Sequence, residues 1–251
     1  MKRIIISASV ALFLSWATDA TRASTYSQQV EADTFVSSGE PDANFGTRGA
    51  MEIAAPTAAQ PRTELALLRF DTSTLLAAFD ADYGAGNWAV TSVSLTLASR
   101  VATAGQQPGN SSFNRIASGG FEFDLLSNNN WNEGSITWNT LPDILPGNGN
   151  SNSLFSLGTY FWPANGTMSS TWTLDLVPTL VDALNSGNPV TIFGQPTAGS
   201  TVGYLFNTQL NDPGFLNVTA EFVPEPALGK FFGLLLGLAW ARNHLPRQTR
   251  R

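Results

Sequence analysis

The sequence predicts an all-β fold: a two-sheet antiparallel β-sandwich, jelly-roll-like, with one short helix and terminal hydrophobic helices. The first observation is an alternation of polar and apolar residues, which places one set of side chains on a core face and the other in water. This alternation runs through residues 92–97, 121–125, 171–176 and 216–222. The second is composition: 22 Gly and 14 Pro among 251 residues suit many short strands joined by turns.

Five further segments have the apolar character of strands and are bounded by turn-forming residues. They are residues 30–38, 51–54, 64–71, 190–194 and 202–207. Together with the alternating segments they make about nine strands with no strong helical pattern between them, and such a series favours two packed sheets.

One interior segment follows a helical period. Leu180 and Leu184 recur at helical spacing, Pro178 suits the first turn of a helix, and Gly187 suits a position just past its end. We therefore predict a short helix from Pro178 to Asn185.

Two other segments break the strand pattern. Residues 73–83 predict either a second helical turn or an ordered loop. Residues 139–170 are rich in Asn, Gly and Ser and predict a long surface loop, part of which is drawn down by its aromatic side chains.

The chain begins like an exported protein. A short basic start, Met1-Lys2-Arg3, precedes a mostly apolar run over residues 4–17 and then small residues. This order is typical of a secretory signal peptide. We predict a signal peptide over residues 1–23 and a mature domain over residues 24–222; the alternative is a buried N-terminal helix.

Residues 223–251 form a second processing segment. Pro224, Glu225 and Pro226 precede an apolar stretch over residues 227–241, and an arginine-rich tail follows. These features in this order resemble the PEP-CTERM sorting signal, which exosortase-type enzymes of Gram-negative bacteria process. The resemblance implies delivery to the cell surface, outer membrane or extracellular matrix, with transient or permanent anchoring in the inner membrane. The alternative is a permanent tail anchor, although the apolar stretch is short for a bilayer.

The region between these ends is acidic. Residues 24–226 contain five arginines, no lysine and eighteen acidic residues, a net charge of −13. Because nucleic-acid binding needs clustered Lys or Arg against phosphates, we exclude nucleic acid as a partner.

The same region lacks the residue types of several catalytic sites. The chain has no Cys, and its one His is His244, in the basic tail. A Ser-His-Asp triad, a cysteine nucleophile and a histidine-bearing zinc site are therefore impossible within residues 24–226. Catalysis by carboxylates alone, as in glycosidases, is the remaining enzymatic possibility.

Four stretches resemble the DNRLRE domain family, which includes carbohydrate-binding modules attached to polysaccharide-degrading proteins. They are residues 32–36 with 41–46 (Ala-Asp-Thr-Phe-Val, then Pro-Asp-Ala-Asn-Phe-Gly), 67–71 (Leu-Leu-Arg-Phe-Asp), 131–139 (Trp-Asn-Glu-Gly-Ser-Ile-Thr-Trp-Asn) and 172–176 (Trp-Thr-Leu-Asp-Leu). The resemblance implies a β-sandwich that binds carbohydrate without cleaving it. The six-letter signature of the family does not occur here.

The candidate carbohydrate-binding residues are Trp131, Glu133, Tyr160 and Trp162. Aromatic faces complement the C–H-rich faces of sugar rings when they are exposed in loops. For each aromatic side chain the alternative is burial in the core, which is also the interpretation favoured for Trp138. Glu133 has a second interpretation too, as an acceptor for the backbone of its own turn.

Two further sets of polar residues have structural interpretations. Asp33, Asp42 and Asn44 lie close in sequence and offer the oxygen ligands that calcium prefers, but Asx-turns that cap the loop are the favoured interpretation. Arg69 and Asp71 are predicted to form a buried pair that fixes the sandwich. No organic cofactor is indicated.

The sequence thus predicts an exported, non-catalytic module that contacts extracellular polysaccharide. One alternative is a purely structural surface or matrix protein whose partners are other proteins. A second is a carboxylate-based polysaccharide hydrolase or lyase.

Overall fold

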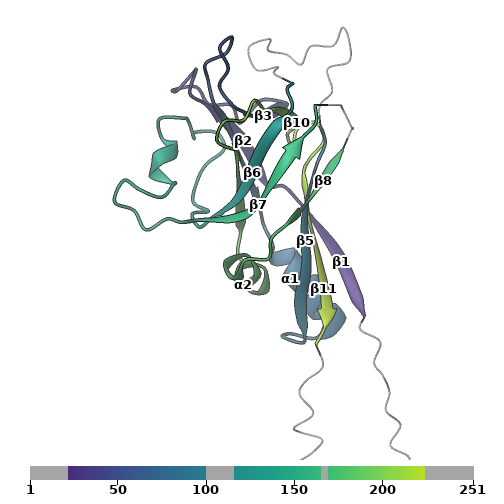
Figure 1. The fold of residues 1–251 in the computed structure, drawn as a ribbon. Coiled ribbons are helices and arrows are strands. Elements are labelled where there is room, and N and C mark those ends of the chain that lie inside the picture. The colour runs from purple at the N-terminus through teal and green to yellow at the C-terminus, as the bar shows by residue number, and fades with distance from the viewer. Residues whose placement is uncertain (1–21, 100–115, 165–168, 224–251) are drawn as a thin grey trace, which may run out of the picture.

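Two antiparallel sheets pack face to face in the computed structural model, which describes residues 22–99, 116–164 and 169–223 (Figure 1). Within these residues there are eleven strands and two α-helices. The predicted two-sheet β-sandwich is therefore confirmed. The terminal hydrophobic segments fall outside the described residues.

The smaller sheet has four strands in the spatial order β1, β11, β5, β8. Their bounds are β1 Ala23–Gln29, β5 Trp88–Leu97, β8 Ser170–Leu174 and β11 Phe215–Phe222. β11 and β5 carry the strict alternation seen in the sequence, and their buried set includes Val93, Leu95, Leu216 and Val218.

The larger sheet has seven strands, with β10, β3, β4, β9, β6 and β7 in order and β2 paired beside β4. Their bounds are β2 Ala32–Ser37, β3 Ala50–Ala54, β4 Glu64–Phe70, β6 Gly119–Leu126, β7 Leu154–Trp162, β9 Val190–Pro196 and β10 Gly203–Asn207. β2 pairs with β4 so that Ala32 lies opposite Arg69 and Asp33 opposite Leu68. This register determines which side chains of β2 and β4 reach the candidate site described below.

Two helices lie toward the lower end of the molecule in Figure 1. α2, Pro178–Ser186, has Pro at its start and ends on Gly187 with φ 62°, so the predicted helix is confirmed. α1, Ser73–Tyr83, buries Leu75, Phe79 and Tyr83 against the sheets. The predicted fold counted one short helix and left residues 73–83 open between a helical turn and an ordered loop; the structure makes them a second helix. The sequence did not decide between the two because α1 has little amphipathic contrast, and tertiary packing stabilises it.

The prediction of a long loop over residues 139–170 was wrong for its second half. β7 pairs with β6 along Leu154–Trp162, with a register shift opposite Phe123 and Asp124. Gly158, with φ +129°, lies at that irregularity. Because such a bulge shifts the alternation by one residue, the segment does not read as a strand in the sequence.

The two ends of the described domain lie side by side. β1 pairs antiparallel with β11, with Ala23 opposite Glu221, so the start of β1 and the end of β11 lie together toward the lower right of Figure 1. The predicted signal peptide and sorting segment lie outside the described residues. In the part of the chain that is described, no helix has the length and apolar character needed to cross a membrane.

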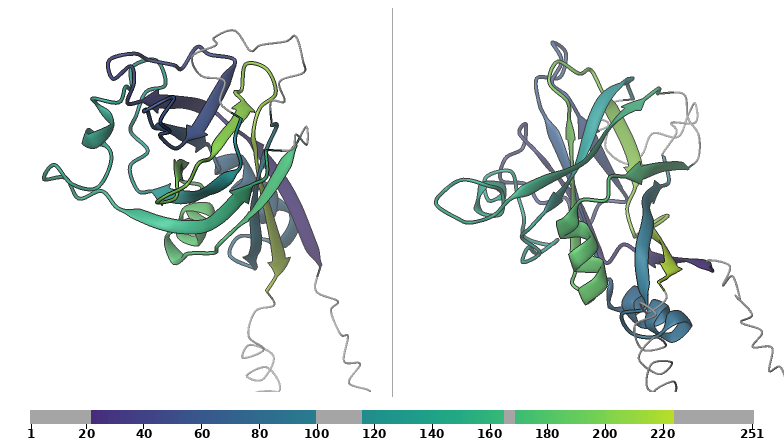
Figure 2. Two further views of the ribbon diagram at one scale, coloured as in Figure 1. Left: turned by 45° about the horizontal axis from the view of Figure 1, so that its top comes forward. Right: turned by 60° about the horizontal axis from the view of Figure 1, so that its bottom comes forward.

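The molecule has two separate apolar clusters. The main cluster fills the space between the sheets and includes Phe121, Phe123 and Tyr204, all fully buried. The second lies on the outer face of the larger sheet, beneath residues 127–153, which include the 3-10 turn η2 (Leu141–Asp143). Figure 2 shows this long segment projecting to one side of the sheets.

Candidate functional site

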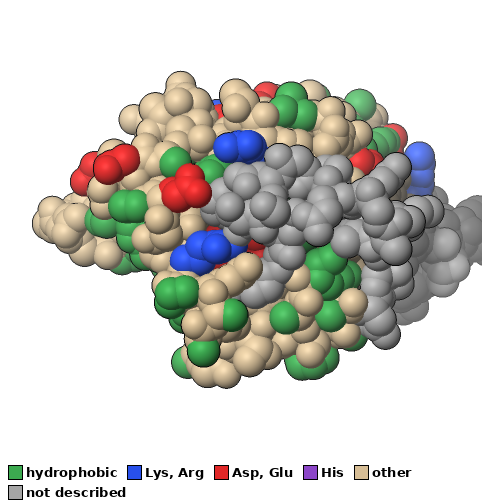
Figure 3. All heavy atoms as spheres, turned by 90° about the horizontal axis from the view of Figure 1, so that it is seen from above, with side chains coloured by type: hydrophobic (Ala, Val, Ile, Leu, Met, Phe, Trp, Pro, Cys, Tyr) green, Lys and Arg blue, Asp and Glu red, His purple; other side chains and the backbone are tan. Residues whose placement is uncertain are grey.

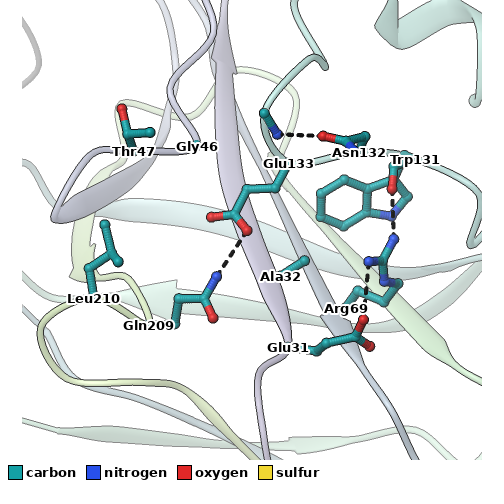
Figure 4. Close-up of a pocket in the computed structure, with 11 residues that line it drawn as sticks. Glu31, Ala32, Gly46, Thr47, Arg69, Trp131, Asn132, Glu133, Gln209 and Leu210 are labelled. Carbon is teal, nitrogen blue, oxygen red and sulfur yellow. Dashed lines mark hydrogen bonds and ion pairs between the residues drawn. The ribbon is translucent and has the colours of Figure 1, made fainter.

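A pocket of about 480 Å³ opens where four segments distant in sequence meet (Figure 4). These segments are the start of β2, the loop between β2 and β3, the loop after β6, and the loop between β10 and β11; β4 forms the floor. The lining residues are Glu31, Ala32, Gly46, Thr47, Arg69, Trp131, Asn132, Glu133, Gly134, Gln209 and Leu210. The volume is within the range of about 300–1,000 Å³ usual for small-molecule pockets.

Arg69 ties the loop after β6 to the sheet. Its Nη1 donates to the carbonyl oxygens of Trp131 (2.7 Å) and Asn129 (3.2 Å), and its Nη2 lies 3.3 Å from Glu31 Oε1. The predicted pair with Asp71 was wrong: Asp71 accepts from the backbone N–H of Ser73 instead. Asp71 belongs to the turn into α1, while Arg69 is directed toward the pocket.

Trp131 lines the pocket but is only 6% exposed. Its Nε1 donates to Thr191 Oγ1 at 3.0 Å, and the Arg69 guanidinium lies 5.0 Å from its ring centroid. Because the guanidinium covers one ring face and the rest of the ring is buried, Trp131 supports the wall of the pocket. The neighbouring Trp138, expected in the core on a strand, is half-buried and lies in a turn packed on the second apolar cluster.

Glu133 is the acidic side chain at the centre of the pocket. Its Oε2 accepts from Gln209 Nε2 at 2.9 Å, as the dashed line in Figure 4 shows. Burial raises the pKa of Glu133, while the hydrogen bond from Gln209 and the charge of Arg69 oppose the shift. The carboxylate is half-buried and reaches the cavity, so it can accept donors from a ligand.

The backbone around Glu133 is held by the loop between β2 and β3. Asn44 Nδ2 donates to the carbonyl oxygens of Glu133 (2.7 Å) and Ile136 (2.8 Å). Gly46 lies so close that a Cβ there would be 2.3 Å from the Glu133 carbonyl oxygen. These contacts explain why a Gly is needed at residue 46 and fix Glu133 relative to β2.

Asp33 lies beneath the pocket and is only 1% exposed. Its Oδ2 accepts from the backbone N–H of Gln209 at 2.7 Å, and its Oδ1 is buried without a hydrogen-bond partner. Burial raises the pKa of Asp33 to about 7, and the charge of Glu133 adds to the increase. Gln209 therefore connects the two carboxylates, one through its backbone and one through its side chain.

The three residues considered for calcium have other partners. Asp33 binds the backbone of Gln209, Asp42 accepts from Asn139 Nδ2 at 2.8 Å, and Asn44 Oδ1 accepts from the backbone N–H of Gly46. The last contact is an Asx-turn, which confirms the structural alternative at Asn44. Across the described ranges, no group of three or more His, Cys, Asp or Glu is placed to hold a metal ion.

The structure brings two of the four predicted site residues together and places the other two elsewhere. Trp131 and Glu133 line the pocket. The Tyr160 hydroxyl donates to the carbonyl oxygens of Leu157 and Thr173, which locks the ring against the main core. Trp162 is 3% exposed, and its ring centroid lies 4.4 Å from that of Tyr204.

Sequence reasoning missed the other side chains of the pocket. Glu31, Gln209 and Leu210 carry no motif, and Arg69 was assigned another partner. Leu210 is 61% exposed at the rim, an unusual position for a leucine, but its residue type alone gives no signal of exposure. The sheet register brings residues as far apart in sequence as Glu31 and Leu210 to the same pocket, and local sequence patterns do not show this.

The pocket offers hydrogen-bonding groups and a small apolar rim, and its geometry does not suit hydrolysis by paired carboxylates. Such a mechanism needs both carboxyl groups beside the scissile bond. Glu133 lines the cavity, whereas Asp33 is buried and does not. The second carboxylate of the lining, Glu31, is paired with Arg69 at 3.3 Å. The site therefore suits reversible recognition of polar groups such as hydroxyls.

The face seen from above in Figure 3 is poorly suited to binding polyanions. In the part of this face that is described, charged side chains are few and scattered among polar and apolar ones (Figure 3). Binding of polyanions depends on clustered Lys and Arg.

Comparisons with known proteins provide one family match. The family model "Carbohydrate-binding module family 96" matches residues 24–160, more than half of the chain. No curated protein matches this sequence. The chain shows a likeness of 12% identity and TM-score 0.23 to a chain in the structure "Israeli acute paralysis virus heated to 63 degree - full particle", over 90% of this chain and 83% of that chain. A TM-score of this size supports no inference.

Proposed function

Because this chain belongs to carbohydrate-binding module family 96, we propose that it is a non-catalytic module that binds extracellular polysaccharide through the pocket around Glu133. The observation that carries the proposal is the convergence of polar groups from distant segments. Glu133, Gln209 and Glu31 all present oxygen or nitrogen atoms to one cavity. Such a cavity can hydrogen-bond several hydroxyl groups of one sugar unit.

Pre-organisation supports binding at this position. Asn44 fixes the Glu133 backbone, Arg69 fixes the Trp131 backbone, and Gln209 orients the Glu133 carboxylate. A site whose side chains are already ordered loses less entropy when a ligand binds. Leu210 adds an exposed apolar surface at the rim for the C–H face of a sugar ring.

The proposal includes the cellular setting. We infer that residues 1–23 direct export and that residues 223–251 act as a sorting segment for an exosortase-type enzyme. The basic-apolar-small order at the start and the Pro224-Glu225-Pro226, apolar and arginine order at the end support this. The resemblance of residues 223–251 to a PEP-CTERM sorting signal supports a role at the cell surface, outer membrane or extracellular matrix.

A glycan array with the purified protein tests the function. We expect binding to at least one class of neutral, acidic or amino-sugar polysaccharide, with or without calcium. Leu210→Ala should weaken the binding up to about tenfold, because it removes apolar contact at the rim. The matched control is Leu176→Ala, since Leu176 is also an exposed leucine (40%) but does not line the pocket.

Three results would count against the proposal. Absence of binding across the panel together with self-association would favour a structural matrix protein. Release of oligosaccharides that Glu133→Gln abolishes would favour a hydrolase or lyase. Equal weakening by Leu176→Ala and Leu210→Ala would move the binding site away from the pocket.

A further inference from the structure

We propose that the pocket selects glycans carrying free amino groups, such as de-N-acetylated hexosamine polymers, over neutral and uronate glycans. This inference rests on the proposed function, because it names the substrate class of the same site. Three features of the site favour such ligands: the charges that line the pocket, the groups that already neutralise them, and the buried carboxylate of Asp33.

The charges of the pocket do not balance. Its lining contains two carboxylates, Glu31 and Glu133, and one cation, Arg69. The Arg69 guanidinium lies 3.3 Å from Glu31 and donates to two backbone carbonyl oxygens. Arg69 is therefore paired with Glu31. Among the described residues no ion pair joins a cation to Glu133, which feels the charge of Arg69 only at longer range.

Asp33 is a second carboxylate near the pocket that a cation would stabilise. Its side chain is 99% removed from solvent, and Oδ1 has no hydrogen-bond partner. Burial raises the pKa of both Asp33 and Glu133, because their ionised carboxylates lose contact with solvent. A cation in the pocket would stabilise the ionised forms of both groups.

A hexosamine ammonium group matches the hydrogen-bonding capacity that remains. A carboxylate offers about four lone-pair positions, and an ammonium group offers three donors. Glu133 accepts from the Gln209 side chain and the Asp33 backbone, so it can accept further donors. Ala32, Thr47 and Leu210 provide apolar surface nearby for the carbon skeleton of the sugar.

A uronate would find the opposite environment. No lysine lines the pocket, Arg69 is already paired, and Glu31 and Glu133 would repel the sugar carboxylate. The surrounding region has a net charge of −13. Like-charge contacts of this kind disfavour a ligand strongly when they are partly desolvated.

Calorimetry at low ionic strength with matched hexamers tests the selection. The probes are a glucosamine hexamer, the fully N-acetylated hexamer of the same sugar, a uronate hexamer, and hexalysine as a cation without sugar. We expect the glucosamine hexamer to bind at least about tenfold more tightly than the acetylated one, the scale of one hydrogen bond between charged partners. The uronate should bind most weakly.

Charge-neutralising variants locate the effect. Glu133→Gln should reduce the preference for the amine to about threefold or less, and Glu31→Gln should also reduce it. Glu31 is exposed, so its variant serves where Glu133→Gln disturbs the fold, which its melting temperature would reveal. The control is Glu40→Gln, which removes the same charge from an exposed residue outside the pocket.

The possible outcomes separate the two proposals. Equal affinity for the two hexosamine oligomers, tighter binding of the uronate, equal binding of hexalysine, or equal effects of Glu40→Gln and Glu133→Gln would each overturn the amine selection and leave carbohydrate binding intact. Absence of binding by these hexamers and by every glycan on the array would overturn both.

Discussion

The two apolar clusters are organised by different forces. The main cluster lies between the sheets and contains a continuous group of aromatic rings, in which Phe121 contacts Phe123, Tyr160, Trp172 and Tyr204. The second cluster is smaller and lies under the long segment over residues 127–153. There, side-chain amides and a guanidinium hold the carbonyl oxygens of the covering segment.

This difference separates stability from recognition. Burial of apolar surface is non-directional, so the main cluster stabilises the sandwich without specifying where a pocket atom lies. Hydrogen bonds have preferred distances and angles, so the second region positions Trp131 and Glu133. Changes in the first region should alter the free energy of unfolding, and changes in the second should mainly alter the site.

The largest expected effect is at Phe121. Phe121→Ala should lower the free energy of unfolding by about 3–5 kcal/mol, because it opens a cavity in a close-packed core. Phe161 is a matched control: it lies on the neighbouring strand β7 but is 63% exposed. Phe161→Ala should change stability by no more than about 0.5 kcal/mol. Denaturant titration measures both, and similar losses would refute the assignment of the main core.

An intermediate effect is expected at Asp33, which lies between the two regions. Burial raises its pKa to about 7, whereas an aspartate in an unfolded chain titrates near about 3.9. Between these values the folded protein holds a proton that the unfolded chain has released. The free energy of unfolding should therefore fall as pH rises from about 4 to about 7, and the loss is complete above that range.

Asp33→Asn removes this titration. Relative to the wild-type protein, the variant should gain on the order of 2–4 kcal/mol between pH 4 and pH 8, because about three pKa units correspond to about 4 kcal/mol. The measurement is a series of denaturant titrations across this range. A constant cost of placing an amide at residue 33 would shift the whole curve, so the difference in slope is the informative quantity. Parallel curves would contradict a raised pKa at Asp33.

The smallest expected effect on stability is at Asn44. Asn44→Ala removes both donors to the carbonyl oxygens of Glu133 and Ile136, at a cost of about 1–3 kcal/mol. Hydrogen exchange should accelerate mainly in residues 132–141, while the core strands keep their protection. Asn44→Asp keeps the Asx-turn acceptor but loses the donors, so it should be at least as harmful. Wild-type behaviour of Asn44→Asp would show that these donors do not hold the segment.

Sequence reasoning was strongest where a strand buries one face and leaves the other in water. β5 and β11 have this arrangement, and their alternation predicted them directly. β1 was missed because its residues are polar and only half-buried, with Tyr26 packed on Phe79. β7 was missed because the irregularity near Gly158 interrupts the period.

The candidate site was predictable only in part. Trp131 and Glu133 belong to a local motif, so a single stretch of sequence identified them. The contacts of Glu133 with Gln209, and of Arg69 with Glu31, join segments 76 and 38 residues apart. Such contacts depend on sheet register and on loop paths, which local patterns do not encode. Trp162 illustrates the reverse error, because an aromatic residue in a polar segment proved to be a core residue.

The pairing of β1 with β11 has a mechanical consequence. β11 lies between β1 and β5 and is bonded to both, and Phe222 ends at the same side as Ala23 begins. Load applied between these two ends would peel β1 from β11 one hydrogen bond at a time. A force applied between Phe222 and a ligand in the pocket would instead act along β11. It would load the hydrogen bonds of β11 with β1 and with β5 in shear, all at the same time. The module should therefore resist traction from a captured ligand better than separation of its own ends.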